Sequence, residues 1–124
     1  MSEDIQRIYI HVDGLKKALQ HGGGTHSIEH VLSAVRDGDA QLWLEKDACI
    51  VTEVNDAPNM RTLHFWLATG TLGDVIALSN KVMAWGRDCG CTVATLSGRR
   101  GWLKALAAEG WEPHSVEMVR RLDG

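Results

Sequence analysis

The chain has 124 residues, of which 44% are hydrophobic and 23% charged, values that predict one globular domain over residues 1–124 with a single core. Its net charge of −3 argues against binding along a nucleic-acid backbone, and no apolar run approaches the roughly 18 residues of a membrane span. The N-terminal residues lack the basic flank of a signal peptide, so we expect the protein inside a cell, or in a particle assembled there.

The first third of the chain is predicted to form one strand and two helices. Residues 4–12 alternate in the manner of a short strand. Residues 12–24 carry apolar side chains at helical spacing and end in three glycines. Residues 25–39 repeat the helical spacing, with Thr25 or Ser27 as the N-cap residue.

The middle of the chain predicts a small antiparallel sheet. Three strand-like segments cover residues 40–46, 49–54 and 62–70, and turn-forming residues separate them. Because the links between these segments are short, consecutive segments are expected to pair as an antiparallel meander.

The last third alternates helical and strand-like segments. Residues 72–91 and 102–110 have helical spacing, whereas residues 92–96 and 114–122 are typical of strands. The predicted order is therefore β-α-α-β-β-β-α-β-α-β. The helix at 72–91 is expected to cross over between two parallel strands.

This order and two sequence segments resemble the GNAT superfamily of acyl-CoA-dependent N-acyltransferases. The segments are WGRDCGC and GRRGWLKALAAEGW, which ends in the Gly110–Trp111 pair. These two segments and GDAQLWLEKDACIVTEV are also similar to short GNAT-like proteins encoded by tailed bacteriophages and prophages. The resemblance implies a single α/β (α+β) domain with a mixed central sheet and helices on both faces.

The segment ATGTLGDV, residues 68–75, matches the loop that holds the pyrophosphate of acyl-CoA in that family, where helix N–H groups and the helix dipole bind it. The resemblance implies a coenzyme loop formed by Gly70, Thr71, Leu72, Gly73 and Asp74. The leading Gln or Arg of the family motif is absent. The Asp74 carboxylate is expected to compete for the same N–H groups and to repel the ligand, at a cost of roughly 1–4 kcal/mol for two like charges about 4 Å apart.

The catalytic residues of the family are only partly matched. The tyrosine that protonates the leaving thiolate corresponds to Leu106, and Tyr9, the only tyrosine, is far away in the sequence. Glu53 and His64 lie on predicted strands and are candidates for the general base. A thiolate can leave without a strong acid, so the missing tyrosine does not by itself exclude catalysis.

Two functions follow from this resemblance. The first is a GNAT-fold protein with an eroded acyl-CoA site, serving as a non-catalytic structural or accessory protein of a phage particle or prophage, cytoplasmic in the bacterial host or virion-associated. The alternative is a small acetyl-CoA-dependent N-acetyltransferase with a variant pyrophosphate loop. A third hypothesis is a binding module that associates through an edge strand or a tryptophan patch. We expect a protein partner or a homo-oligomer, and neither membrane nor direct nucleic-acid binding.

Other polar residues allow more than one interpretation. Arg99 and Arg100 oppose the dipole of the last helix, so they are expected to pair within the chain, remain solvated, contact a protein partner or bind a cofactor phosphate. His26 and His30 are four residues apart, which permits a metal, but we expect structural histidines and no metal site. The three cysteines are expected to be reduced thiols.

Overall fold

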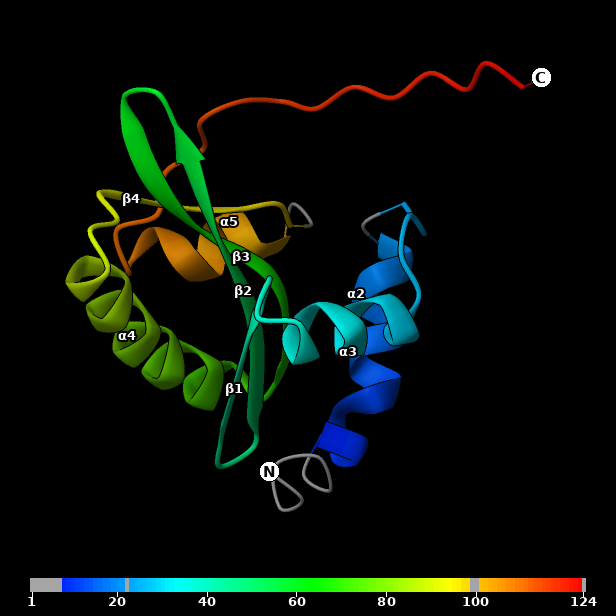
Figure 1. The fold of residues 1–124 in the computed structure, drawn as a ribbon, viewed down its shortest axis with the longest axis horizontal. Helices are drawn as coiled ribbons and strands as arrows, with labels where there is room; N and C mark the ends of the chain where they lie inside the picture. The colour runs from blue at the N-terminus through cyan, green and yellow to red at the C-terminus, as the bar shows by residue number, and fades with distance from the viewer. Residues whose placement is uncertain (1–7, 22, 99–100, 124) are drawn as a thin grey trace.

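The computed structural model describes residues 8–21, 23–98 and 101–123. The helices are η1 (Tyr9–His11), α2 (Val12–His21), α3 (Ile28–Arg36), α4 (Leu72–Asp88) and α5 (Gly101–Ala107). The strands are β1 (Gln41–Glu45), β2 (Ala48–Ala57), β3 (Met60–Gly70) and β4 (Val93–Leu96). Figure 1 shows the strands in the centre, with α4 on one side and α2 and α3 on the other.

The sheet has the strand order β1-β2-β3-β4. β1, β2 and β3 pair as an antiparallel meander, and β4 pairs with β3 in parallel after the α4 crossover. The antiparallel meander and the parallel pairing after the α4 crossover were both predicted, and both are confirmed. The β3–β4 pairing runs only from Thr62–Val93 to Phe65–Leu96, so residues 66–70 of β3 have no β4 partner and the two strands separate there.

Helices cover both faces of the sheet, as the fold class predicted. Two apolar clusters show the division. On one face, α2 and α3 pack against the sheet through Leu15, Leu19, Ile28, Val31, Cys49, Val51 and Leu67. On the other face, α4 packs through Val75, Leu78, Val82, Ala48, Ile50, Leu63 and Phe65.

A β-bulge at Trp66 changes the alternation of β3. Val51 pairs with Leu67 and Thr52 pairs with Phe65, which leaves Trp66 without a partner. Phe65 therefore joins the α4 cluster, while Trp66 packs against the α2–α3 cluster. A bulge of this kind bends a strand and increases its twist, and it turns β3 at the point where β4 separates from it.

The predicted first strand is wrong over the residues that the structure describes. Residues 9–12 are helical, and residues 4–7 lie outside the described ranges. The physical reason is that Ile8, His11, Leu15 and Leu19, spaced three and four residues apart, are buried, whereas Tyr9 and Ile10 are exposed. The helical period thus begins at Ile8 and outweighs the local alternation.

The predicted last strand is not formed either. Residues 112–121 have no regular secondary structure. Figure 1 shows this segment extending away from the body of the protein. An alternating sequence becomes a strand only where another strand supplies backbone partners, and this segment has none within the described part of the chain.

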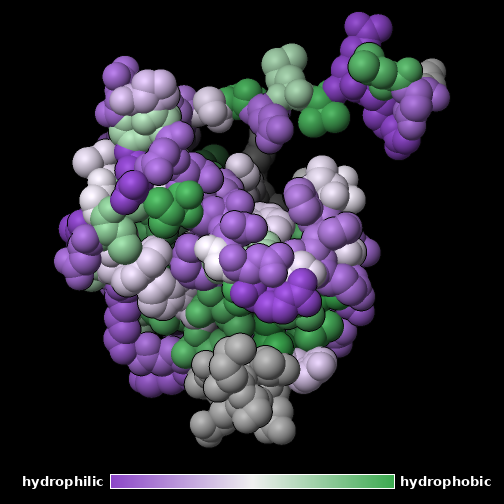
Figure 2. Space-filling model, in the orientation of Figure 1, coloured by the Kyte–Doolittle hydropathy of each residue, from purple (hydrophilic) through white to green (hydrophobic). Residues whose placement is uncertain are grey.

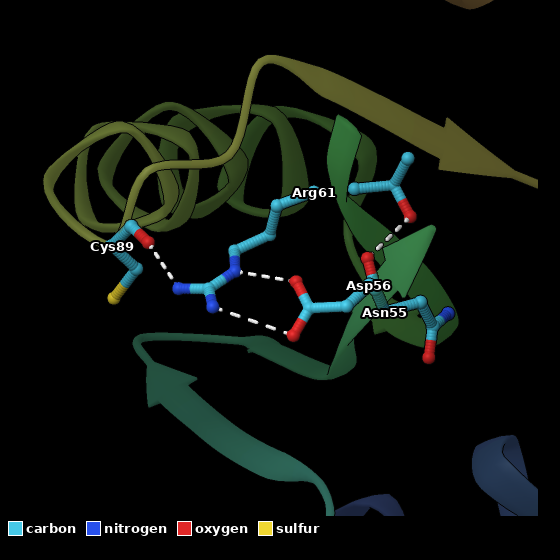
Figure 3. Close-up of polar contacts among 5 residues, drawn as sticks. Asn55, Asp56, Arg61 and Cys89 are labelled. Atoms are coloured by element: carbon cyan, nitrogen blue, oxygen red, sulfur yellow. Dashed lines mark hydrogen bonds and ion pairs between the residues drawn. The ribbon is translucent and has the colours of Figure 1, made fainter. Parts of the chain in front are cut away.

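Arg61 joins the β2–β3 hairpin to the start of β4 (Figure 3). Its guanidinium donates hydrogen bonds to Asp56 Oδ1 at 2.6 Å and to the Cys89 carbonyl at 2.7 Å. Its own carbonyl accepts a hydrogen bond from the Thr92 amide at 3.0 Å. The Asp56 carboxylate raises the pKa of Arg61. These bonds fix where β4 enters the sheet.

The three cysteines are free thiols. Cys49 is buried in the α2–α3 cluster, and this burial raises its pKa to about 12, so its thiol stays protonated. No helix within the described ranges is both long and apolar enough to cross a membrane.

Gly70 provides a test of the fold. It has φ +128°, and a Cβ there would overlap the Asp47 carbonyl oxygen, whereas Gly38 has φ +83° with open space around it. Gly70→Ala is therefore expected to lower the free energy of unfolding by about 2 kcal/mol more than Gly38→Ala, because only the first adds a backbone collision to the strained φ. Urea unfolding of both variants measures the difference, and equal losses would contradict the packing described.

Candidate functional site

The turn between β1 and β2 is joined to the N-terminus of α4 by Asp47 and Asp74. The Thr71 amide donates hydrogen bonds to the carbonyl of Asp47 at 3.1 Å and to its Oδ2 at 3.2 Å. In return, the Asp47 amide donates to Asp74 Oδ2 at 3.2 Å. Gly70 lies directly against the Asp47 carbonyl, an approach that leaves no room for a side chain. The two carboxylates therefore hold the first turn of α4 in place.

This arrangement corrects the expectation for Asp74. Its carboxylate was expected to occupy the amides of its own helix, but it accepts a hydrogen bond from Asp47, 27 residues earlier. The amides of residues 72–74 donate to no acceptor in the described part of the chain, because the first turn of a helix has no carbonyl to offer them. Three donors at the positive end of the helix dipole are thus free to bind an anion.

The carboxylates of Asp47 and Asp74 would nevertheless make the binding of an anion less favourable. Asp47 takes the Thr71 amide, and both carboxylates lie at the same end of α4. An anionic ligand bound to the three free amides would be repelled by these carboxylates, and the repulsion weakens with distance and solvent. An anion bound here would be held by backbone groups, because residues 70–74 include no cationic side chain.

A cleft of about 410 Å³ opens at this end of α4. Leu72, the first residue of α4, lines it together with Gly101, Trp102 and Ala105 of α5. Trp102 forms part of the cleft wall and lies close to Gly98, two residues after the end of β4. Among the residues that the structure describes, this lining is apolar and carries no titratable side chain.

The candidate bases lie on the sheet rather than in the cleft lining. Glu53 and His64 are directly opposite each other on β2 and β3. His64 Nδ1 and Thr95 Oγ1 form a hydrogen bond of 2.9 Å, one position before the β3–β4 pairing ends. The structure thus brings Glu53 and His64 together beside the point where the two strands separate.

The two other residues considered for catalysis have no role in the cleft. Leu106 is half-buried on α5 and has no proton to donate. Tyr9 is 69% exposed on η1 and is not part of the cleft lining. Arg99 and Arg100 lie outside the described residues, so their predicted contacts are not placed.

The histidines near α3 have structural roles. Ser27 is the N-cap residue of α3, as predicted, and its amide donates to His30 Nδ1 at 2.9 Å. His26 packs edge-on against Trp66, with 5.2 Å between ring centroids. Within the described residues, no three His, Cys, Asp or Glu side chains group as a metal site would require.

Asp47 and Trp102 are site residues that the sequence analysis did not identify. Asp47 falls between two predicted strands, and Trp102 falls at the start of a predicted helix. The Gly–Trp step at 101–102 marks a helix start, but nothing in the local sequence relates it to Leu72. The connection appears only when the fold places the two helix ends side by side.

Sequence comparison finds no matching protein-family model and no matching curated protein. Solved acetyltransferase structures match over most of their length. A probable acetyltransferase has a TM-score of 0.67 and 9% identity, with 96% of this chain and 95% of that chain covered. An aminoglycoside acetyltransferase from an uncultured soil metagenomic sample, solved with sisomicin, has a TM-score of 0.63 and 13% identity, with 93% and 88% covered.

The protein TTHA1254 of Thermus thermophilus matches with a TM-score of 0.60 and 20% identity, and 92% of each chain is covered. These matches show that the chain shares the fold of TTHA1254 and of the two acetyltransferases, which confirms the predicted fold class. The closer resemblance to phage-encoded proteins stays a prediction.

The free amides of α4 can be tested with a charge at Gly73, where a Cβ would meet nothing within 4 Å. Gly73→Glu places a second carboxylate in the first turn, where it favours the helix but repels a polyphosphate. We expect acetyl-CoA affinity to fall at least about tenfold, since roughly 1.4 kcal/mol of repulsion suffices. Isothermal titration calorimetry measures the change.

Asn80→Asp is the matched control, because it adds the same charge to α4 about two turns farther along. It should leave the affinity within about twofold, because the added charge is remote and screened. Equal losses for the two variants would contradict binding at the first turn, and so would an unchanged affinity for Gly73→Glu.

Proposed function

We propose that this protein binds acetyl-CoA at the N-terminus of α4 and transfers the acetyl group to a primary amine. The single observation that carries the proposal is the hydrogen bond from the Asp47 amide to Asp74. Because Asp74 is engaged there, the carboxylate that would obstruct coenzyme binding leaves the amides of residues 72–74 free. The fold shared with solved acetyltransferases supports the same conclusion.

The residues around the cleft fit the parts of this coenzyme. The amides of residues 72–74 would hold the pyrophosphate, and Leu72 and Trp102 would cover the apolar portions of the ligand. Residues 66–70 of β3 have no β4 partner, so their backbone groups on that side can bond to an extended amide chain. When bound, acetyl-CoA supplies an activated thioester whose thiolate can leave without a strong acid.

His64 and Glu53 supply the base chemistry of the proposal. An amine must lose a proton before it can attack, and an imidazole is suited to accept that proton near neutral pH. The Thr95 hydroxyl bonded to Nδ1 orients the His64 ring, while Nε2 has no partner within the described part of the chain. Glu53, opposite His64, adds a negative charge that would attract an ammonium group.

The proposal is tested by binding and by turnover. Titration of the full chain with acetyl-CoA should give one saturable site per chain, and incubation with spermidine, an aminoglycoside and a peptide with a free N-terminus should release coenzyme A with at least one of them. Absence of saturable binding would overturn both coenzyme binding and catalysis.

The base residues give a separate prediction. His64→Gln and Glu53→Gln are expected to lower kcat, with a loss on the order of 100-fold for the residue that accepts the proton, and to leave acetyl-CoA affinity unchanged. His21→Gln, at the exposed end of α2, is the matched control and should retain full activity. If kcat is unchanged in both strand variants, neither residue is the base.

A second candidate function is supported by the cleft lining and by Leu106. The described part of the cleft lining has no titratable side chain, and the position of the family acid is occupied by a leucine. These features favour a protein that binds the coenzyme, or only retains the fold, while acting as a non-catalytic accessory component, such as one of a phage particle. Saturable acetyl-CoA binding without turnover on any amine would favour this function over acetyl transfer.

A further inference from the structure

The C-terminal segment, residues 112–123, carries several large apolar side chains that are exposed. Four large apolar side chains in this segment are almost fully exposed: Val116 at 86%, Met118 at 89%, Val119 at 85% and Leu122 at 93%. Figure 2 shows apolar side chains alternating with polar ones where the segment stands clear of the body. Large apolar side chains gathered in one exposed segment are typical of an interaction site.

In an extended chain, Val116, Met118, Arg120 and Leu122 fall on one side, and Glu117, Val119 and Arg121 fall on the other. Three of the four exposed apolar side chains therefore share one side of the segment. The segment is already extended, but its backbone has no strand partner within the described residues. The segment could therefore form a strand if the edge of another strand lay beside it.

β4 has one edge that is not paired with another strand. It lies at the end of the sheet order and pairs with β3 on one side only. No backbone hydrogen bond to its other edge comes from any residue that the structure describes. Val93 of β4 and Leu103 of α5 are also exposed, at 42% and 51%. An unpaired edge beside exposed apolar side chains is a template for strand addition.

The C-terminal segment begins close to β4. Trp111 packs edge-on against Phe65, with 5.6 Å between ring centroids, and Phe65 is the register partner of Leu96 at the end of β4. The segment thus leaves the body beside β4 and then extends away from it (Figure 1). A second copy related by a two-fold axis near this point would place each segment along the β4 edge of the other copy.

We propose that the C-terminal segment adds a strand to the free edge of β4 in a second copy of this chain, and that the exchange is reciprocal. Each copy then both donates and receives a strand, which doubles the buried area and removes the unpaired edge in both copies. The strand predicted from the alternation at residues 114–122 forms only in this dimer. The proposal is independent of coenzyme binding.

Light scattering during size-exclusion chromatography tests the proposal with the full chain. Unmodified protein should elute at twice the chain mass of 13.6 kDa. Met118→Pro removes a backbone donor within the segment and should weaken dimerisation at least about tenfold. Glu117→Ala, on the polar side of the same segment, is the matched control and should remain dimeric.

Amide hydrogen exchange locates the receiving surface. The outward amides of β4 should be protected in the unmodified protein and lose that protection in Met118→Pro, while the amides of β2 keep theirs. A monomeric unmodified protein, a dimeric Met118→Pro variant, or β4 exchange that is the same in both would each overturn the proposal. A monomer with protected β4 amides would assign the pairing to the same chain.

Discussion

The structure depends on the way in which the β1–β2 turn holds the start of α4. The carbonyl and the carboxylate of Asp47 accept hydrogen bonds from the Thr71 amide, and the Asp74 carboxylate accepts one from the Asp47 amide. Gly70 makes this close approach possible, because any side chain there would meet the Asp47 carbonyl. These hydrogen bonds join a turn to a helix 24 to 27 residues away in the sequence, and the next three amides have no acceptor among the described residues.

The second constraint is the short pairing of β3 with β4. The two strands share only four register pairs, and the Trp66 bulge turns β3 where the pairing ends. Arg61 fixes the opposite end of β4 through Asp56, Cys89 and Thr92. The separation of the strands and the open end of α4 thus arise from features at opposite ends of the same strands. The cleft itself lies between the start of α4 and α5.

Much of the fold could be predicted from the sequence because its signals are local. The apolar periods of α2, α3 and α4, and the short turns of the meander, each depend on neighbouring residues. The terminal strands could not be predicted in the same way. The alternation at residues 9–12 belongs to a helix whose buried face continues from Ile8, and residues 114–122 have no strand beside them.

The chemistry of the candidate site could not be predicted from the sequence. Leu72 of the predicted loop lines a cleft, but the hydrogen bonding of the Asp74 carboxylate depends on Asp47, which only the folded chain brings near. Likewise, Glu53 and His64 were chosen as separate candidates, and the register of β2 and β3 makes them a pair. Contacts between distant segments decide these points, and no local pattern encodes them.

The central claim is that three backbone amides at the start of α4 bind the coenzyme. Two-dimensional ¹H–¹⁵N NMR during titration with coenzyme A tests it most directly, because each amide reports its own environment. The account predicts that the largest saturable shifts occur at Leu72, Gly73 and Asp74, with smaller shifts at the Trp102 indole. Unchanged amide signals at these residues under saturating coenzyme, or shifts confined to another surface, would contradict it.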